Sequence, residues 1–329
     1  MSEVPLAVDL LIVGAGPAGL FGTYYAGFRG LSVAVVDSLP ELGGQISAMY
    51  PEKLIHDVAG FPAVKGRDLV AHLAEQAASA GPTYLLGRTA TSLSQDDAGV
   101  RVGLDDGTVV SAKAVVLTAG IGTFTPRPLP AAQGWDGGHV SFFVPSFDAY
   151  VDRDVVVVGG GDSAFDWALH LEPVARSVTL VHRRDTFRAH QATVDAVLAS
   201  SVSVRTKANV AALVGDTDLE AVDITDLETK EVERVKAQEV VAALGFLADL
   251  GPLTQWGIEV DNRHVVVDPA MRTNLSRVYA AGDITEYPGK VRLIAVGFGE
   301  VATAVNNAAV EIDPGKSLFP GHSTEREGS

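Results

Sequence analysis

The chain of 329 residues contains no cysteine. This absence excludes disulfide bonds, thiolate metal ligands, a cysteine nucleophile and a redox-active dithiol. The eight histidines show no metal-ligand spacing, and neither a G-x-S-x-G nor an H-E-x-x-H motif occurs. The sequence therefore predicts neither a metal site nor a hydrolase of those classes.

Basic residues and long apolar runs are also scarce. Lys and Arg number 25 against 41 Asp and Glu, which gives a formal net charge of −16. Such a chain is poorly suited to nucleic acids or anionic membranes. No apolar run reaches the roughly 20 residues that span a bilayer, and the start, MSEVPLAVDLL, lacks the features of a secretion signal. We therefore expect a cytoplasmic protein with neither a nucleic-acid nor a membrane partner.

Glycine, by contrast, is abundant, and its placement reveals an internal repeat. Residues 9–20 read DLLIVGAGPAGL, and residues 154–165 read DVVVVGGGDSAF. Each segment is a continuous apolar run followed by a glycine-rich turn and the start of a helix, which is typical of parallel strands buried on both faces. The repeat predicts an α/β fold with two Rossmann-like dinucleotide-binding domains.

The order of segments predicts that one domain is inserted into the other. Pro- and Gly-rich crossings are expected after residues 110–122 and at residues 245–252. A strand at residues 277–281 and a long helix at residues 293–310 would then return to the first domain. We expect a discontinuous first domain, residues 1–122 and 252–329, with a C-terminal extension from about residue 314, and an inserted domain, residues 123–251.

The first glycine motif predicts a pyrophosphate site. Gly14 permits the tight turn, Gly16 lets a pyrophosphate approach the backbone, and Gly19 lets the helix pack closely on the strand. The start of a helix favours negative charge because its N–H groups are free. Asp37 ends the next expected strand, 21 residues beyond Gly16, where an acid can accept hydrogen bonds from ribose hydroxyls.

A downstream motif favours FAD over NAD in this first site. Residues 271–284 read MRTNLSRVYAAGDI, a buried strand that ends in Gly282 and Asp283. Asp283 can reach the ribityl hydroxyls of a flavin, and Gly282 gives the chain room beside the pyrophosphate. The alternative is a Gly-Asp turn that only caps the following segment.

The second motif predicts an NADPH site. Gly159 and Gly161 follow the strand at residues 155–158, and Asp162 and Ser163 begin a helix that they can cap. At the position that corresponds to Asp37, this unit carries basic residues instead of an acid, and guanidinium groups bind a 2′-phosphate bidentately. The basic residues expected to select NADPH over NADH are His182, Arg183, Arg184 and Arg188.

Together these segments resemble the low-molecular-weight thioredoxin reductase superfamily. The matching pieces are VGAGPAGL, GGQ at residues 43–45, VVVVGGGDSA, VHRRDTFR and VYAAGDI. The resemblance implies an NADPH domain inserted into a discontinuous FAD domain, and a homodimer. The chain departs from thioredoxin reductase because the Cys-x-x-Cys pair is missing, and without a thiolate it cannot exchange disulfides.

A narrower resemblance, to the thioredoxin-reductase-like ferredoxin–NADP+ reductases, rests on residues 49–62, MYPEKLIHDVAGFP, and on a C-terminal extension with His322 and Thr324. It implies that Tyr50 covers one face of the isoalloxazine and His322, from the partner subunit, the other. Asp57 and Thr324 would lie close to the ring. The residues expected to bind FAD are thus Gly14, Gly16, Pro17, Ala18, Gly19, Asp37, Gly44, Gln45, Tyr50, Asp57, Gly282, Asp283 and Thr324.

The resulting hypothesis is a ferredoxin– or flavodoxin–NADP+ reductase. Hydride would pass between NADPH and flavin N5, and single electrons between the flavin and a small carrier protein. Tyr50, His322 and Thr324 would cover the flavin faces and the N5 side, with no acid or base required. The alternatives are an NADPH oxidase or reductase of another acceptor on the same frame, and a non-catalytic NADPH- or redox-sensing flavoprotein. Carrier docking would use scattered basic residues such as Lys53, Lys65, Arg67 or Lys290.

Overall fold

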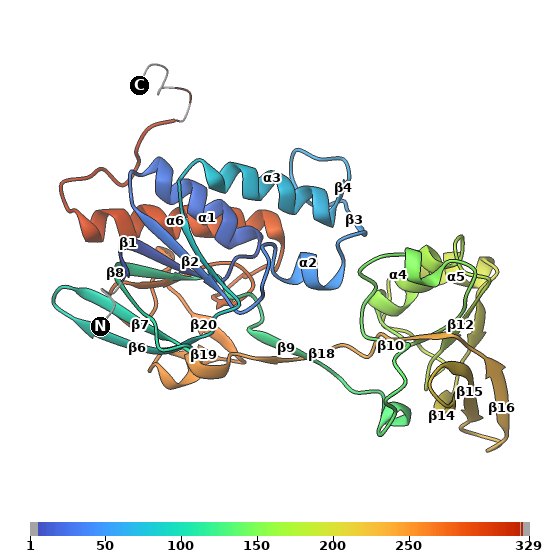
Figure 1. The fold of residues 1–329 in the computed structure, drawn as a ribbon. Helices are drawn as coiled ribbons and strands as arrows, with labels where there is room; N and C mark the ends of the chain where they lie inside the picture. The colour runs from blue at the N-terminus through green and yellow to red at the C-terminus, as the bar shows by residue number, and fades with distance from the viewer. Residues whose placement is uncertain (1–5, 323, 325–329) are drawn as a thin grey trace. The chain divides into compact units, whose positions relative to one another are not determined.

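The computed structural model describes residues 6–322 and Thr324. The chain forms two compact units, one from residues before 124 and after 247, the other from residues 124–247 (Figure 1). The second unit is therefore inserted into the first, as the fold class requires. Strands β9 (Thr123–Pro126) and β18 (Phe246–Asp249) pair with each other where the chain passes from one unit to the other.

The first unit is built on a seven-stranded sheet in the order β5-β2-β1-β8-β7-β6, with β21 beside β8. Strands β1, β2, β5, β8 and β21 are parallel, whereas β6 and β7 are antiparallel to their neighbours. The strands are β1 (Leu6–Val13), β2 (Val33–Asp37), β5 (Thr83–Leu86), β6 (Ala90–Asp96), β7 (Gly99–Leu104), β8 (Val109–Leu117) and β21 (Val278–Ala280).

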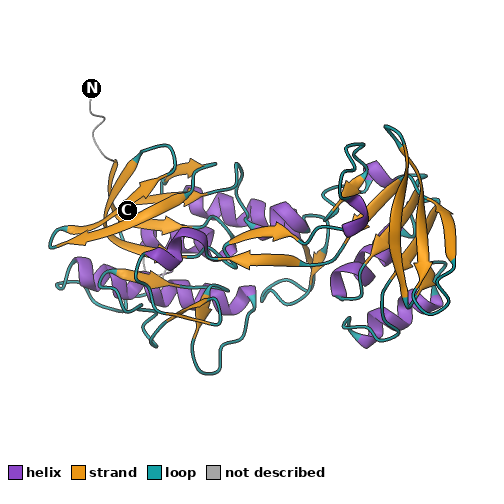
Figure 2. Cartoon of the chain, turned by 90° about the horizontal axis from the view of Figure 1, so that it is seen from below, coloured by secondary structure: helices purple, strands orange, loops and turns teal. Residues whose placement is uncertain are grey.

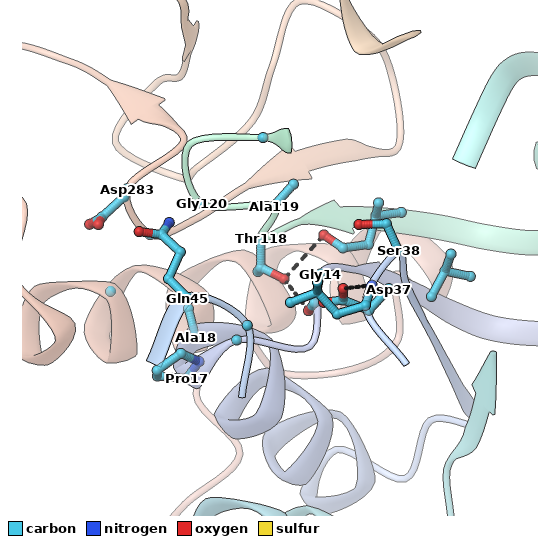
Figure 3. Close-up of a pocket in the computed structure, with 18 of the residues that line it drawn as sticks. Gly14, Pro17, Ala18, Asp37, Ser38, Gln45, Thr118, Ala119, Gly120 and Asp283 are labelled. Atoms are coloured by element: carbon cyan, nitrogen blue, oxygen red, sulfur yellow. Dashed lines mark hydrogen bonds between the residues drawn. The ribbon is translucent and has the colours of Figure 1, made fainter. Parts of the chain in front are cut away.

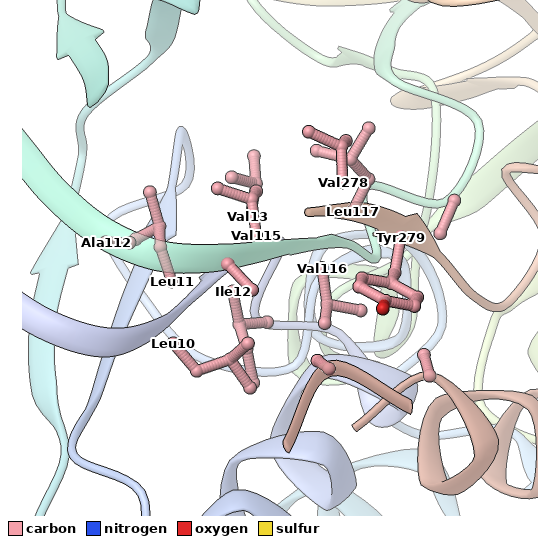
Figure 4. Packing of buried hydrophobic residues seen from close by; sticks show 14 of the residues in the cluster. Leu10, Leu11, Ile12, Val13, Ala112, Val115, Val116, Leu117, Val278 and Tyr279 are labelled. Atoms are coloured by element: carbon pink, nitrogen blue, oxygen red, sulfur yellow. The ribbon is translucent and has the colours of Figure 1, made fainter. Parts of the chain in front are cut away.

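Burial on both faces explains the apolar runs of this sheet. Leu10, Leu11 and Ile12 of β1 are fully buried, as are Val116 of β8 and Tyr279 of β21. Figure 4 shows these side chains packed above and below the strands. Because β1, β2, β8 and β21 are parallel, their carboxyl ends meet at one edge of the sheet, where ligands bind in open parallel sheets.

Helices complete the first unit: α1 (Pro17–Phe28), α2 (Gln45–Met49), α3 (Gly66–Ala78) and α6 (Ile294–Ile312). Helices α1, α3 and α6 lie together on one face of the sheet (Figure 1). Small residues permit close packing of α1 on α6, because a Cβ on Gly22 would lie 2.5 Å from a methyl of Val301. Smaller elements are β3 (Leu54–Ile55), β4 (Val64–Lys65), η3 (Gly251–Gln255), β19 (Val260–Asp261), β20 (His264–Val266) and β22 (Thr285–Glu286).

The second unit repeats the arrangement on a smaller scale. A five-stranded parallel sheet has the order β10-β17-β11-β12-β13, and a three-stranded antiparallel sheet has the order β14-β15-β16. Both units combine helices and strands throughout (Figure 2). The elements are η1 (Pro130–Ala132), β10 (Val140–Ser141), η2 (Asp148–Tyr150), β11 (Asp154–Val158), α4 (Asp162–Leu171), β12 (Ser177–Val181), α5 (Gln191–Ala199), β13 (Ser203–Arg205), β14 (Ala208–Gly215), β15 (Leu219–Asp226), β16 (Val232–Lys236) and β17 (Glu239–Ala242).

Two Rossmann-like units, β1-α1-β2 and β11-α4-β12, confirm the predicted fold class. None of the helices in the described part of the chain is long and apolar enough to cross a membrane.

Candidate dinucleotide sites

The glycines of the first motif have three different structural tasks. Gly14 has φ +116°, and a Cβ there would lie 2.4 Å from the carbonyl oxygen of Thr118. A Cβ on Gly19 would lie 1.9 Å from the carbonyl oxygen of Gly14. Gly16, the N-cap of α1, has no heavy atom within 4 Å of its Cβ position. Gly14 and Gly19 are therefore required by the protein's own packing, whereas Gly16 leaves open space at the start of a helix.

A pocket extends from this open space along the carboxyl edge of the sheet. Its walls combine the first motif, the ends of β2 and β8, and the Gly282–Asp283 turn (Figure 3). It is lined by Val13, Gly14, Gly16, Pro17, Ala18, Val36, Asp37, Ser38, Leu39, Gly44, Gln45, Ile46, Tyr50, Arg88, Thr89, Ala90, Thr118, Ala119, Gly120, Gly122, Leu250, Pro252, Leu253, Gly282, Asp283, Leu293, Ile294 and Gly297.

Asp37 lies at one end of the pocket and holds the motif in shape. One carboxylate oxygen accepts the N–H of Ala15 at 2.6 Å, and the other accepts the N–H of Leu39 at 2.8 Å. Burial raises the pKa of Asp37 above its usual value, and the two N–H donors oppose this effect. Each carboxylate oxygen retains a further lone pair for a ligand hydroxyl.

The segment at residues 43–45 closes over the motif. Gly44 has φ +57°, and a Cβ there would lie 3.0 Å from the Cα of Gly16. The Gln45 amide lies against Gly120, at the end of the loop that follows β8, and on the side of Asp283 (Figure 3). The resemblance pointed to Gly44 and Gln45, and the structure places both in the pocket wall.

Asp283 and Tyr50 mark the other end of the pocket. The carboxylate of Asp283 lines the pocket and forms no hydrogen bond or ion pair with any of residues 6–322. Burial raises the pKa of Asp283, while Lys290 and Arg292 partly oppose this. Burial, together with the charges of Asp283 and Asp57, raises the pKa of Tyr50 to about 12.

Four of the predicted residues lie outside this pocket wall. Asp57 is exposed and lines a neighbouring shallow hollow with Phe61 and Ala295. His322 and Thr324 are exposed, and the ring of His322 packs edge-on against that of Phe319 at 5.1 Å. The remaining predicted FAD residue, Gly19, supports the motif from beneath.

Sequence reasoning missed several residues of the pocket wall. Thr118 donates its hydroxyl to the carbonyl of Gly14 at 2.8 Å and so braces the motif from β8. Arg88 lines the end near Asp37 and forms an ion pair with Asp106 at 2.7 Å. The run VVLTAG at residues 115–120 carried a signal for Thr118, because a buried parallel strand must end at the edge where Gly14 lies.

The second motif reproduces the geometry of the first. A Cβ on Gly159 would lie 2.4 Å from the carbonyl oxygen of Ala243, just as Gly14 meets Thr118. Gly161 is the N-cap of α4, and no heavy atom lies within 4 Å of its Cβ position. Ala164 is fully buried at the position of the third glycine. Gly161 therefore leaves the same open space as Gly16.

The prediction that Asp162 and Ser163 cap this helix was wrong. Gly161 is the N-cap, and no side chain caps the helix. Asp162 is already the first helical residue, and its carboxylate instead accepts the N–H of His190 at 2.8 Å. The glycine at the cap takes the extended conformation, which moves both side chains one position into the helix.

The basic segment after β12 folds back onto the glycine turn. The N–H of Arg188 donates to the carbonyl of Gly160 at 2.8 Å, and the ring of His182 lies against Gly160. Burial lowers the pKa of His182, and the charges of the neighbouring arginines add to this. The guanidinium groups of Arg183, Arg184 and Arg188 are exposed, and within the described chain no carboxylate forms an ion pair with them.

The expected role of Lys290 in carrier docking was wrong. Its side chain is 1% exposed and forms an ion pair with Glu300 at 2.5 Å. Lys65 is half-buried and Arg67 is exposed, and both are paired with Glu52, at 3.5 and 2.5 Å. A buried cation cannot contact a partner protein, and surface cations that are already paired attract an acidic partner more weakly.

Known ferredoxin–NADP reductases are similar to this chain over nearly its whole length. A ferredoxin–NADP reductase of Nocardioides sp. (strain ATCC BAA-499 / JS614) is 71% identical over 97% of this chain and 97% of its own. One from Frankia alni (strain DSM 45986 / CECT 9034 / ACN14a) is 61% identical over 96% of this chain and 98% of its own.

Solved structures of thioredoxin reductases share the fold. The crystal structure from T. acidophilum is 26% identical, with a TM-score of 0.79 over 94% of this chain and 99% of that one. The Lactococcus lactis structure is 22% identical, with a TM-score of 0.77 over 93% of this chain and 99% of that one. The family model for pyridine nucleotide-disulphide oxidoreductases matches residues 8–308. The chain belongs to the pyridine nucleotide-disulphide oxidoreductase family.

Proposed function

We propose that this chain is an FAD-dependent ferredoxin–NADP+ reductase that exchanges electrons with ferredoxin or flavodoxin. One observation carries the proposal: a single unit holds an elongated pocket with an open helix start in its middle and an unpaired carboxylate at its far end. Relatives 60–71% identical over nearly the whole chain bear the ferredoxin–NADP reductase name.

The pocket suits FAD in three places. The open space at Gly16 accepts a pyrophosphate, which the N–H groups at the start of α1 would bind. Asp37 would accept hydrogen bonds from the adenosine ribose at one end. Asp283 would accept them from the ribityl chain at the other, because its carboxylate has no partner among the described residues.

The second unit suits NADPH for a parallel reason. Gly161 leaves room for the pyrophosphate at the start of α4. Arg183, Arg184 and Arg188 would bind the 2′-phosphate, since each presents an exposed guanidinium without a protein carboxylate. His182 is held neutral and would donate or accept a single hydrogen bond rather than supply charge.

The bound flavin would supply the exchange between a two-electron nicotinamide and a one-electron carrier. The chain's own part is to hold the rings and exclude water. Tyr50 stays protonated, so its ring would present an uncharged face to the isoalloxazine. His322 of the partner subunit would cover the opposite face, and Thr324 would lie on the N5 side. No acid or base is required of the protein.

The acceptor is not a dithiol protein, because this chain has no cysteine with which to exchange a disulfide. We also propose a homodimer in the cytoplasm. The dimer would let the C-terminal extension, exposed at His322 and Thr324, reach the pocket of the partner subunit.

The test is steady-state oxidation of NADPH by the purified protein with ferredoxin, flavodoxin or thioredoxin as acceptor. We expect bound FAD, rapid reduction of ferredoxin or flavodoxin, and none of thioredoxin. Oxygen as the only effective acceptor would instead indicate an NADPH oxidase. Cofactor binding without turnover would indicate a sensor.

A further inference from the structure

A buried ion pair lies directly behind the Gly282–Asp283 turn. Lys290 and Glu300 are 1% and 5% exposed, and their Nζ and Oε1 atoms are 2.5 Å apart. The hydroxyl of Tyr287 donates to the same carboxylate oxygen at 2.5 Å. Apolar residues of similar volume often stabilise a fold as well as such a pair does. Stability alone therefore does not account for its placement.

The pair holds the backbone of Gly282 from both sides. The N–H of Gly282 donates to Oε2 of Glu300 at 2.7 Å, and Nζ of Lys290 donates to the carbonyl of Gly282 at 3.0 Å. Gly282 has φ +83°, a conformation that favours glycine, and a Cβ there would lie 3.3 Å from that of Ala18. The turn is thus fixed by charge-assisted hydrogen bonds beside the first residues of α1.

What this fixation controls is the next residue, Asp283. Its carboxylate lines the pocket and forms no hydrogen bond with the rest of the described chain. No side-chain partner therefore holds it, and its direction follows from the backbone that precedes it. Glu300 lies one helical turn after Gly297, whose own Cβ position is 3.4 Å from the Cα of Gly282. Helix α6 thus reaches the turn with both a small residue and a charged one.

We propose that Lys290 and Glu300 are positioning residues for the flavin: by holding the Gly282 peptide at both polar atoms, they aim the Asp283 carboxylate at the ribityl chain. The inference rests on the proposed binding of FAD in this pocket. It assigns to the pair a role in cofactor geometry, although neither side chain lines the pocket.

The test compares three variants. Lys290→Met removes the charged donor to the Gly282 carbonyl and leaves the two neutral donors, the hydroxyl and the N–H of Thr285. Lys290→Met combined with Glu300→Gln also removes the charge that would be left unpaired, so this double variant should fold. Arg292→Met is the matched control. Arg292 lies in the same loop, and its charge lowers the pKa of Asp283 as that of Lys290 does. Its guanidinium bonds the carboxylate of Glu286 at 2.7 Å and not Gly282.

The measurements are the FAD dissociation constant of each apoprotein, the visible absorption spectrum of the bound flavin and its midpoint potential. We expect the first two variants to bind FAD at least tenfold more weakly, with a shifted spectrum and potential. Arg292→Met should bind FAD within twofold of the parent. A merely structural role would lower the melting temperature and leave the spectrum and potential of the bound flavin unchanged.

A folded double variant with the parent's affinity, spectrum and potential would overturn the inference. If neither Lys290 variant folds, Tyr287→Phe removes only the hydroxyl donor to Glu300. It should weaken FAD about threefold, and unchanged binding and spectrum would then overturn the inference. Failure of the parent protein itself to bind FAD would refute the proposed function and is seen before any variant is made.

Discussion

Gly16 and Gly14 belong to one motif, but their surroundings predict that substitution by alanine affects a different property at each position. An added methyl group meets no protein atom within 4 Å at Gly16. At Gly14 it would lie 2.4 Å from the carbonyl oxygen of Thr118, on a backbone with φ +116°. Gly16→Ala should therefore act on the ligand, and Gly14→Ala on the fold.

The magnitudes differ accordingly. In Gly16→Ala, the poorer N-cap and the lower entropy of the unfolded chain oppose each other, so apoprotein stability should change by less than about 1 kcal/mol. The methyl group would displace the pyrophosphate from about two charge-assisted hydrogen bonds, which is about 3 kcal/mol or roughly 100-fold in FAD affinity. In Gly14→Ala, the positive φ costs about 1–2 kcal/mol and the overlap about 1–3 kcal/mol more.

The assay pairs urea unfolding of each apoprotein with titration of FAD followed by flavin fluorescence. Gly299→Ala is the control, because Gly299 is exposed on α6 and also has no neighbour within 4 Å. It should gain about 0.5–1 kcal/mol of stability and bind FAD normally. Parent-like FAD binding by Gly16→Ala would refute the reasoning, as would a loss of stability equal to that of Gly14→Ala.

Three further predictions concern charge. Arg183→Ala or Arg184→Ala should raise the KM for NADPH roughly 10- to 100-fold, from about 1.5–3 kcal/mol per charged hydrogen bond, and leave that for NADH unchanged; steady-state kinetics with equal losses for both would contradict the assignment. The pKa of Tyr50 is about 12, above the usual value of 10, so the stability that this residue contributes is complete below pH 10 and is lost as pH rises through 12. Between pH 10 and 12, the free energy of unfolding of Tyr50→Phe should therefore fall less steeply than that of the parent protein. Identical pH profiles of unfolding free energy for the two proteins would contradict this prediction. Glu300→Ala should cost about 3–5 kcal/mol of unfolding free energy because it leaves the Lys290 ammonium buried and unpaired, and a loss below about 1 kcal/mol in urea unfolding would show that water reaches the site.

Much of the fold could be predicted because its signals are local. The run DLLIVGAGPAGL contains a buried strand, a turn and a helix start in twelve consecutive residues, and the structure places them in that order. The strand before Gly282 and the helix at residues 293–310 were likewise found, as β21 and α6. Continuous apolar runs and glycine turns are properties of short segments and need no knowledge of the rest of the chain.

The features that sequence reasoning missed depend on tertiary contacts. Lys290 looked like a surface cation because nothing near it in the sequence shows that Glu300 of α6 covers it. Thr118 and Arg88 enter the pocket from strands and loops far from Gly14 along the chain. The predicted cap at Asp162 failed by one residue, since the choice between Gly161 and Asp162 is made by backbone conformation rather than by side-chain type.

The central claim is that the pocket beside Gly16 and Asp283 holds a flavin that passes electrons from NADPH to a one-electron carrier. Anaerobic stopped-flow mixing of the purified protein with NADPH, and then with oxidised ferredoxin or flavodoxin, tests it most directly. The account predicts one FAD per chain, bleaching by NADPH in preference to NADH, and recovery of the flavin colour as the carrier is reduced. A colourless protein, or a bleached flavin that no carrier restores, would contradict it.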